Sequence, residues 1–345
     1  MKILVIRRDN IGDLVCTTPL LRCLSAQIPG AVIDVLANEY NYQVLEGNPD
    51  VRKIWIYQKA KHRQEGHSRL GVWLKSLRLL LRVRRERYDY VIIASPGYQS
   101  SAVRLARYSG ARFILGYAHP GAGVSAGLPA EEAALGHEVE ATLRLASLLG
   151  LDVRHVPPLR LVPQPDLRQR YCEKFPCLGR TVLAVHISAR KPSQRWPAEY
   201  FAALLKVLCM EHGVQILLFW SPGATDDVLH PGDDEKALEI TKMCAGLPVF
   251  PVKTTDLRSL VAALSLAGGY IGADGGAMHL AAGIGLPIVA FFGQSDCQRW
   301  RPWGERTCIL QPASRNVADI SVDEVVSACL RLGMISNGKI KETVS

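Results

Sequence analysis

A short stretch, Tyr270–Asp296, carries side chains that could bind an anionic ligand. It reads YIGADGGAMHLAAGIGLPIVAFFGQSD: an apolar strand ends at Asp274, and two glycines and His279 then open a helix of small residues. In crossover units of this kind, ligands bind at the carboxyl ends of strands and beside helix N-termini, whose N–H groups favour negative charge. Gly275 and Gly276 would permit positive φ angles and a close approach of the backbone to a phosphate. The pattern predicts an anionic ligand here, although a lone histidine at this position is as often a packing or capping residue.

A second candidate phosphate-binding segment is HISARKPSQRWPAEYF, residues 186–201. It follows a predicted strand and precedes a helix that has Pro197 near its first position. A loop with hydroxyl, amide and basic side chains before a helix N-terminus suits phosphate binding. We expect Trp196 to anchor the loop by packing. The candidate ligand residues are Ser188, Arg190, Lys191, Gln194 and Arg195.

An acidic loop could hold a ribose. FWSPGATDD, residues 219–227, follows a predicted strand, and carboxylates beyond strand ends accept hydrogen bonds from ribose hydroxyls. Asp226 and Asp227 are therefore candidates, and the alternative is a solvated acidic loop.

The first strand is followed by RRDNIGDLVCTTPLL, residues 7–21, where a dinucleotide-binding enzyme would carry G-x-G-x-x-G. A single glycine, Gly12, stands there with Asp13 after it, which counts against a dehydrogenase. GAGVSAG, residues 121–127, has the wrong spacing and is expected to be a loop. Asp13 has two interpretations: a carboxylate favoured at a helix N-terminus, or a general base approached by substrate past Gly12.

The net charge of +9 implies an acidic partner, and the positive charge is concentrated in one segment. Residues 59–87, KAKHRQEGHSRLGVWLKSLRLLLRVRRER, contain many bases and two acids, with apolar residues at helical spacing. This predicts a basic amphipathic helix docked on a sheet, which could also contact anionic phosphates or a membrane surface. A nucleic-acid binder is disfavoured, because no nucleic-acid motif is present and Trp73 is the one aromatic residue among the basic side chains of this segment.

Composition places the chain among globular cytosolic proteins. Its 345 residues are long enough for two cores, and 48% are hydrophobic. The start lacks the long apolar region of a secretory signal, and apolar runs fall far short of the roughly 20 residues that span a bilayer. The nine cysteines are odd in number and scattered, with no second pair to match Cys172 and Cys177. We therefore expect reduced thiols, no metal site and no cofactor.

Strands and helices alternate along both halves of the chain, which predicts α/β structure with parallel sheets. A proline-rich stretch, residues 153–166, separates the two series and is expected to hold the linker. We predict two Rossmann-like domains facing across a cleft, residues 1–160 and 161–335, with a frayed tail at 336–345. The predicted strands are residues 2–7, 31–37, 51–57, 88–95, 112–118, 181–188, 214–220, 247–252 and 270–273. The first predicted helix is residues 15–28, VCTTPLLRCLSAQI.

These segments, in this order, resemble the ADP-heptose:lipopolysaccharide heptosyltransferases, glycosyltransferase family nine. The resemblance rests on ILVIRRDNIGDLVCTTPLLRCLSAQIPGAVIDVL, QRWPAEYF and GADGGAMHLAAGIGLPIVAFFG, and it covers most of the chain. It implies the GT-B fold, with a nucleotide-sugar donor held mainly by the C-terminal domain. The anion at Asp274–His279 is then implied to be the diphosphate of that donor.

The resemblance also implies roles for single residues. Asp13 matches the proposed catalytic base, which takes a proton from the acceptor hydroxyl. Ser188 matches a hydroxyl on the diphosphate loop, Asp226 or Asp227 falls near the acid that holds the ribose, and Thr255 falls near the adenine. In the last signature, Asp274 and His279 match residues on the donor sugar and diphosphate, with the N–H groups around Gly275 and Gly276 on the phosphate.

The resemblance extends to the acceptor side and shows two departures. Relatives carry bases that meet the acceptor's phosphates near Lys59, Lys61, His62 and Arg63. Many have serine or threonine where this chain has Gly275, and often lysine where it has Gln194. The missing positive charge must come from Arg190, Lys191 or Arg195, or the diphosphate is held less tightly.

The expected activity is inverting transfer of heptose from ADP-heptose to a phosphorylated lipopolysaccharide core acceptor, without a metal, by a cytosolic enzyme at the inner membrane face. One alternative is a related transferase with another nucleotide-sugar or acceptor. Another is a non-catalytic nucleotide-sugar-binding protein, which an intact Asp13 disfavours. A nucleotide-sugar epimerase of similar fold fits the Gly12-Asp13 start less well.

Overall fold

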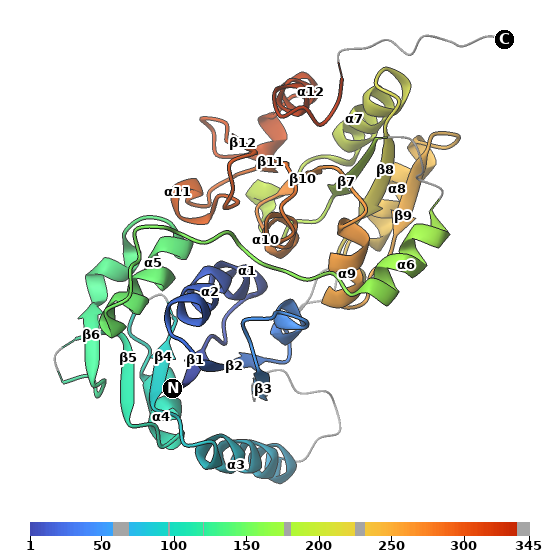
Figure 1. Ribbon diagram of the computed structural model, residues 1–345. Helices are drawn as coiled ribbons and strands as arrows, with labels where there is room; N and C mark the ends of the chain where they lie inside the picture. Colours follow the sequence, from blue (N-terminus) through green and yellow to red (C-terminus); the bar gives the residue numbers. More distant parts are fainter. Residues whose placement is uncertain (58–68, 96, 120, 176–180, 225–231, 337–345) are drawn as a thin grey trace. The chain divides into compact units, whose positions relative to one another are not determined.

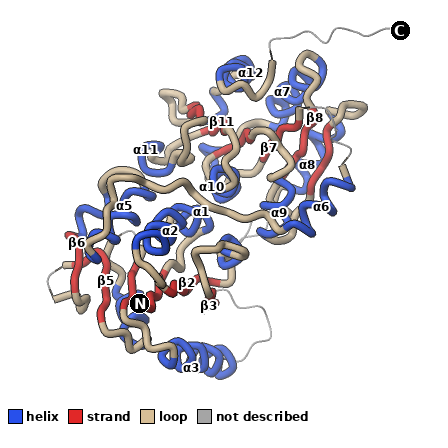
Figure 2. Tube along the Cα trace, in the orientation of Figure 1, coloured by secondary structure: helices blue, strands red, loops and turns tan. Residues whose placement is uncertain are grey.

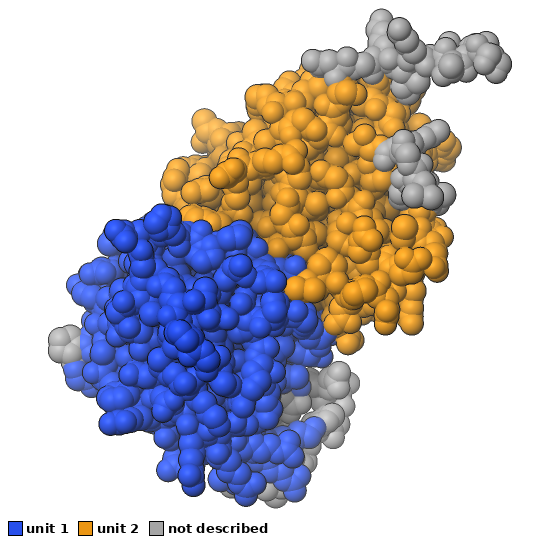
Figure 3. All heavy atoms as spheres, viewed as in Figure 1, with its two compact units in different colours: residues 1–161 blue, residues 162–345 orange. Residues whose placement is uncertain are grey.

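The computed structural model describes residues 1–57, 69–95, 97–119, 121–175, 181–224 and 232–336. The chain divides into two compact units, Met1–Leu161 and Val162–Ser345 (Figure 3). The division falls within the proline-rich stretch at residues 153–166.

Unit 1 is built on a six-stranded sheet, ordered β3-β2-β1-β4-β5-β6, in which every neighbouring pair is parallel. Its strands are β1 (Lys2–Ile6), β2 (Val32–Asn38), β3 (Lys53–Tyr57), β4 (Tyr90–Ile93), β5 (Phe113–Ala118) and β6 (Ala126–Pro129). The central strands are near-continuous apolar runs because helices cover both faces of a parallel sheet. β1 lies between β2 and β4, with Ile3 opposite Ile33 and Tyr90.

The helices of unit 1 pack on both faces of this sheet (Figures 1 and 2). They are α1 (Ile11–Cys16), α2 (Thr18–Gln27), α3 (Arg69–Arg85), α4 (Ser100–Tyr108) and α5 (Glu138–Arg144), with 3-10 helices η1 (Tyr42–Leu45), η2 (Ala130–Ala134) and η3 (Leu145–Leu149). Side chains of α3 and α4, including Val83 and Val103, pack with Leu4 and Ile6 on one face. α5 packs beside α1 and α2.

Two local predictions in unit 1 were wrong in detail. The helix expected at residues 15–28 starts earlier, at Ile11, and is interrupted at Thr17, because Pro19 in the first turn of α2 has no N–H with which to continue α1. The segment expected to be a loop at residues 121–127 runs into β6, which pairs Gly127 with Gly116 of β5. A Cβ on Gly127 would lie 3.0 Å from the Gly116 carbonyl oxygen, so the glycine permits this close pairing.

Unit 2 has a second six-stranded parallel sheet, ordered β12-β11-β10-β7-β8-β9. Its strands are β7 (Val182–His186), β8 (Gln215–Phe219), β9 (Val249–Val252), β10 (Tyr270–Ala273), β11 (Ile288–Phe291) and β12 (Thr307–Leu310). The strand order reverses direction between β7 and β10, and in open α/β sheets ligands bind outside the carboxyl ends of the strands at such a switch point.

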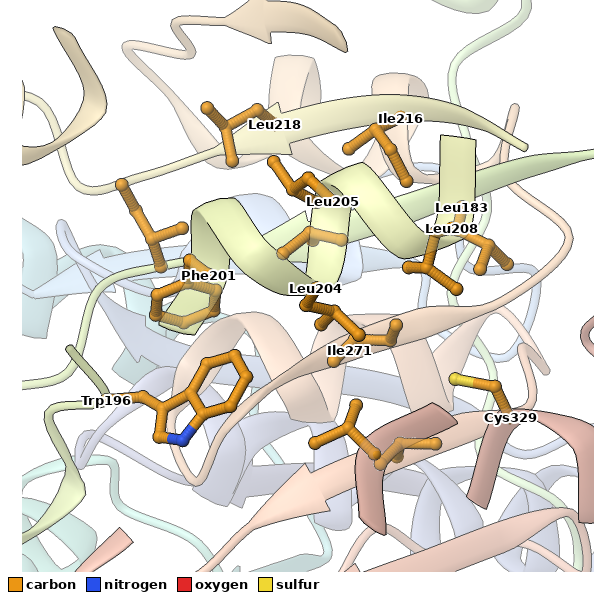
Figure 4. Close-up of a cluster of buried hydrophobic side chains, with 14 of the residues drawn as sticks. Leu183, Trp196, Phe201, Leu204, Leu205, Leu208, Ile216, Leu218, Ile271 and Cys329 are labelled. Atoms are coloured by element: carbon orange, nitrogen blue, oxygen red, sulfur yellow. The ribbon is translucent and has the colours of Figure 1, made fainter. Parts of the chain in front are cut away.

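The helices of unit 2 are α6 (Pro165–Lys174), α7 (Ala198–Met210), α8 (Asp234–Met243), α9 (Leu257–Leu264), α10 (Gly276–Gly283), α11 (Cys297–Trp300) and α12 (Val322–Arg331), with 3-10 helices η4 (Pro192–Gln194) and η5 (Val317–Asp319). α7, α8 and α12 pack on one face of the sheet in a single apolar cluster (Figure 4). α6, α9 and α10 pack in sequence, α6 against α9 and α9 against α10. α6 was not predicted, and its first two residues fall in the proline-rich stretch that was expected to hold the linker.

Trp196 anchors the loop that follows β7, as expected from the sequence. Its side chain is 1% exposed, and its ring lies 4.8 Å from that of Phe201 (Figure 4). The ring of Phe291 lies 5.1 Å away. The indole Nε1 donates a hydrogen bond to the Ile320 carbonyl oxygen at 2.9 Å. One end of the candidate phosphate loop is therefore fixed in the core.

None of the helices in the described part of the chain is both long enough and apolar enough to cross a membrane.

Candidate functional site

The loops after β7, β10 and β11 are joined by a polar cluster centred on Gln194. The Gln194 amide nitrogen Nε2 lies 2.8 Å from Oδ2 of Asp274 and 2.8 Å from Oγ of Ser295. Gln194 is 4% exposed, whereas Asp274 is half-buried. The Lys191 ammonium lies 3.4 Å from the same Ser295 hydroxyl. Lys191 is exposed, so a cation stands at the solvent side of this cluster.

The N-terminus of α10 opens next to this cluster. Its N-cap, Gly275, has no side chain, so no hydroxyl or carboxylate of the cap competes for the first N–H groups of the helix. Such N–H groups, together with the helix dipole, attract anions. Asp274 ends the preceding strand, and its own N–H is held by the Phe291 carbonyl oxygen at 2.9 Å. The carboxylate is thereby fixed at the strand end.

The expected positive φ angles at the glycine pair are not present. Gly275 has φ 166°, which is extended backbone open to any residue, and Gly276 is the first residue of α10. A Cβ on Gly275 would meet no heavy atom within 4 Å. The glycine here is therefore not required by the backbone conformation. It leaves open space beside Asp274.

A third glycine in the motif, Gly272, is required because a side chain there would collide with a neighbour. A Cβ on Gly272 would lie 2.7 Å from the hydroxyl oxygen of Tyr270, which folds over it. That hydroxyl is fully buried and has no hydrogen-bond partner among the described residues. Burial, and secondarily the charge of Asp274, raise the pKa of Tyr270, so it stays protonated.

His279 lies in the first turns of α10 and is 3% exposed. Its ring meets that of Trp300 edge-on, with the centroids 6.2 Å apart. The packing interpretation of His279 therefore has direct support. Its backbone N–H donates to the Gly275 carbonyl oxygen at 3.3 Å, which places the residue in the first turn of α10.

The remaining basic and hydroxyl residues of the loop after β7 have different surroundings. Ser188 accepts a hydrogen bond at Oγ from the Ser221 backbone N–H at 2.9 Å, which ties the loop to the end of β8. The Arg195 guanidinium donates to the Ala189 carbonyl oxygen at 3.1 Å. Arg190 is exposed. Among the three candidate bases, Lys191 is the one with a described contact to the Gln194–Asp274–Ser295 cluster.

Sequence reasoning missed Lys236, a half-buried lysine of α8. Its ammonium donates to the Ile187 carbonyl oxygen at 3.2 Å and to the Trp196 carbonyl oxygen at 2.7 Å. These carbonyls stand just before and at the end of the candidate phosphate loop, so one side chain joins both ends. Burial lowers the pKa of Lys236, while Asp233 raises it. Nothing in the local sequence marks this lysine among the others on the helix.

His186, the last residue of β7, was also missed. It is 8% exposed, and burial lowers its pKa to about 4, against a smaller opposing effect of Asp233. At neutral pH its imidazole is therefore uncharged. His186 ends β7 just before the candidate phosphate loop and adds no positive charge there.

The other expected donor residues are at the same sheet edge or outside the described residues. Thr255 follows β9 and is exposed, one residue before Asp256, which caps α9 by accepting from the Ser259 N–H at 2.9 Å. Asp226 and Asp227 lie outside the described residues.

In unit 1, Gly12 and Asp13 lie within α1, directly after β1. Asp13 is 4% exposed, and its Oδ2 accepts from the backbone N–H and the side-chain amide of Asn10, each at 2.9 Å. Its Oδ1 lies 2.5 Å from the guanidinium Nη2 of Arg7. Asp13 therefore does act as a carboxylate at the N-terminus of α1, where it accepts from the N-cap residue.

The acceptor candidates Lys59, Lys61, His62 and Arg63 lie outside the described residues. The predicted basic helix is present from Arg69 as α3 and ends in a turn that contains Arg82, Arg84 and Arg85.

Among the described residues, no group of three or more His, Cys, Asp or Glu side chains is placed to hold a metal ion. The described cysteines are free thiols.

Comparisons with known proteins identify the family. The family model of glycosyltransferase family 9 (heptosyltransferase) matches residues 76–325. Lipopolysaccharide heptosyltransferase 3 of Escherichia coli K12 is 25% identical over 300 residues, which cover 85% of this chain and 83% of that protein.

Two solved structures share the fold. The Escherichia coli ADP-heptose lipopolysaccharide heptosyltransferase II superposes with a TM-score of 0.75 at 24% identity, over 96% of this chain and 98% of that one. An Escherichia coli heptosyltransferase solved with ADP gives a TM-score of 0.78 at 18% identity, over 96% and 100%. With its two six-stranded parallel sheets, the chain has the GT-B fold and belongs to glycosyltransferase family 9.

Proposed function

We propose that this protein transfers heptose from ADP-heptose to a phosphorylated lipopolysaccharide core acceptor, with inversion at the anomeric carbon. The observation that carries the donor half is the cluster of Gln194, Asp274 and Ser295 beside the N-terminus of α10. It combines a carboxylate for sugar hydroxyls with backbone N–H groups and a lysine for a diphosphate. The relatives named as lipopolysaccharide heptosyltransferases support the choice of donor and acceptor.

The donor would bind to unit 2. The diphosphate meets the first N–H groups of α10 and the Lys191 ammonium, which stabilise the charge that develops on the leaving ADP. Asp274 accepts hydrogen bonds from hydroxyls of the sugar, and its orientation is fixed by the amide of Gln194. Asp226 or Asp227 would hold the ribose, and Thr255 would lie near the adenine.

The acceptor would bind to unit 1. Asp13 takes the proton from the acceptor hydroxyl as its oxygen attacks the anomeric carbon. The bond from that carbon to the ADP oxygen breaks as the new glycosidic bond forms on the opposite face. Lys59, Lys61, His62 and Arg63 would meet the acceptor's phosphates.

The α3 surface would hold the protein at an anionic membrane, where a lipid-linked acceptor resides. Residues 69–85 contain no acidic residue. On the described part of the helix, Leu77 and Leu81 are 39% and 48% exposed, one turn apart, and Arg78 and Arg82 are exposed beside them. Apolar residues flanked by bases on an exposed helix face suit the interface of an anionic bilayer.

The second candidate is transfer from a different nucleotide-sugar. The space beside Gly275, and the neutral Gln194 where relatives often have lysine, favour a donor whose sugar or diphosphate differs from ADP-heptose. The base and the leaving-group chemistry would be unchanged.

A transfer assay tests both candidates. Purified protein is given ADP- and UDP-linked sugars with phosphorylated and dephosphorylated core acceptors, and product and nucleotide release are measured. Asp13→Asn is the matched control: a general base contributes about 10²–10⁴-fold, so turnover should fall by that factor while calorimetric donor affinity stays nearly unchanged. Transfer from another sugar would support the second candidate. Donor binding without transfer to any acceptor would favour a non-catalytic nucleotide-sugar-binding protein.

Two further variants test the donor site by calorimetry. Asp274→Ala should weaken the complete nucleotide-sugar more than free ADP, because the carboxylate contacts the sugar. His279→Ala should weaken both ligands. Equal loss of the two ligands in Asp274→Ala would place that carboxylate at the nucleotide or in a purely structural role.

A further inference from the structure

Arg7 forms a buried cluster with three carboxylates at the carboxyl end of β1. Its guanidinium is 0% exposed, and Nη2 lies 2.5 Å from Oδ1 of Asp13 and 2.6 Å from Oε1 of Glu138. Nη1 donates to the Ala94 carbonyl oxygen. The remaining nitrogen, Nε, lies 3.5 Å from Oδ2 of Asp9. The nitrogen Nη2 is thus shared by the carboxylates of Asp13 and Glu138, and the carboxylate of Asp9 lies near Nε.

Glu138 is the least expected member of this cluster. It is 0% exposed and comes from the first turn of α5, 131 residues along the chain from Arg7. A buried carboxylate carries a large desolvation penalty unless it is paired and hydrogen-bonded. A chain that needed only to neutralise Arg7 could do so with Asp13 alone. Glu138 adds a negative charge where burial makes it costly, which calls for a reason beyond pairing.

The other ionisable groups around the cluster do not change its charges, which are one positive guanidinium and the carboxylates around it. Burial lowers the pKa of Arg7, but Glu138, Asp13 and Asp9 raise it, with a net rise, so the guanidinium stays charged. Tyr117 of β5 faces Glu138, and burial raises its pKa, so it is neutral. Further ionisable groups stand on the elements packed against α1 and α5, among them Glu131 and Glu132 of η2. His137 caps α5 through Nδ1, Arg22 of α2 pairs with Asp50 at 3.9 Å, and Tyr42 of η1 is half-buried.

We propose that Glu138 is a positioning residue that keeps Asp13 basic by drawing part of the positive charge of Arg7 away from it. This inference rests on the proposed function, in which Asp13 is the general base. An arginine paired with a single carboxylate stabilises the ionised form and makes it a poor proton acceptor. When Glu138 competes for the same Nη2, that stabilisation is divided between two carboxylates. Arg7 then orients Asp13 with a smaller loss of proton affinity.

Replacing Glu138 with glutamine tests this division of charge. Glu138→Gln retains the side-chain shape and an oxygen that can accept from Nη2, but removes the negative charge. Arg7 then pairs with Asp13 alone, so the half-maximal pH on the acid side of the kcat profile should fall by about one unit. At pH 8, kcat should fall several-fold because the base is weaker, while the KM for the donor is unchanged.

A graded variant and a matched control accompany it. Asp9→Asn removes a more distant and partly exposed carboxylate from Arg7, so it should shift the profile in the same direction by a smaller amount. Glu140→Gln, on the same helix but without contact to Arg7, should leave the profile in place. If Glu138→Gln fails to fold in a thermal unfolding measurement, the shift in Asp9→Asn decides the question.

A titration that needs no substrate separates this inference from the proposed function. The carboxyl carbon of Asp13 is followed by NMR in protein labelled at aspartate, with its signal identified by its absence in Asp13→Asn. A lower titration midpoint in Glu138→Gln supports the division of charge even if no transfer is found. An unchanged or higher midpoint, in Glu138→Gln and Asp9→Asn alike, overturns it even if the protein is an active transferase.

Discussion

The side-chain amide of Gln194 donates a hydrogen bond of 2.8 Å to the carboxylate of Asp274, and 80 residues of sequence separate the two. A neutral amide thus orients the strand-end carboxylate without adding a charge. A cation is supplied by Lys191, whose ammonium lies 3.4 Å from the Ser295 hydroxyl that Gln194 also contacts. Orientation of the carboxylate and supply of positive charge are therefore divided between two residues of one loop.

This division predicts unequal effects of two neighbouring bases. Lys191→Ala should lower the affinity for ADP about fivefold, because a charge-assisted hydrogen bond to an exposed site contributes roughly 1 kcal/mol. Arg190→Ala, which removes an exposed base one residue away, should change it less than twofold. Calorimetry at low and high salt measures both, and the Lys191 effect should shrink with salt. Equal effects of the two variants would indicate general attraction by the loop and not a specific contact.

The open space at Gly275 predicts that Gly275→Ser is tolerated. Its φ of 166° is accessible to serine, and its Cβ would meet no atom within 4 Å, so thermal stability should not fall. As the N-cap residue, serine would accept a hydrogen bond from the first N–H groups of α10 and compete with the donor's diphosphate for them. One hydrogen bond of about 0.5–1.5 kcal/mol would then weaken ADP binding up to about tenfold.

Gly293 provides the matched contrast to Gly275. A Cβ there would collide with the backbone of Ser193, so Gly293→Ser should destabilise the protein. Similar unfolding temperatures for the two serine variants would contradict the description of both sites.

Lys236 is predicted to hold the phosphate loop closed at its two ends. Lys236→Met retains most of the apolar stem but leaves the Ile187 and Trp196 carbonyls without this donor, which should cost about 1–3 kcal/mol of unfolding free energy. ADP affinity should fall as well, because the loop loses its fixed shape. Lys242→Met, at an exposed position on the same helix, is the control for urea unfolding and calorimetry. Unchanged ADP affinity in Lys236→Met would limit this lysine to a structural role.

His186 predicts a pH dependence of stability with a definite sign. Its pKa is about 4 in the folded protein and about 6.5 when unfolded, so the unfolded chain binds more protons between these values. Unfolding free energy should therefore decrease as pH falls from about 6.5 to about 4 and should not decrease further from this group below that range. Urea unfolding of His186→Gln should show a smaller decrease than the natural protein across the same window. Parallel curves for the two proteins would indicate that the imidazole is accessible to protons when folded.

The exposed face of α3 predicts binding to anionic membranes. Leu81→Glu should reduce co-sedimentation with phosphatidylglycerol vesicles several-fold, since it removes an inserted apolar group and adds a repelled charge. Leu238→Glu on α8, where the leucine is 56% exposed, is a control of the same chemistry in the other unit. Binding that survives in Leu81→Glu, or that is equal on neutral vesicles, would remove α3 as the contact surface.

Local patterns were sufficient for most of the elements. Apolar runs between turns predicted strands β1 to β5 and β7 to β10 and the parallel sheets, because a strand buried on both faces is apolar along its own length. β6 was not predicted, because its segment was expected to be a loop. The strand, glycine and helix order at Asp274 predicted the sheet edge at which Gln194, Asp274 and Ser295 meet. Trp196 was identifiable as an anchor because a large aromatic beside a helix start rarely stays in solvent.

Contacts between loops were decided by the tertiary structure. Which loops meet depends on the order of the strands in the sheet. The hydrophobic pattern within one segment does not show which strand will lie next to it. The amide of Gln194 therefore finds Asp274 only once β7 and β10 are paired. Lys236 and Glu138 were invisible for the same reason, since a lysine or glutamate in a helix reads as a surface residue until packing buries it. Asp13 was identified from the sequence, but its contact with Arg7 is made only in the folded unit. The fold also brings a glutamate 125 residues further along the chain to the same Arg7 nitrogen.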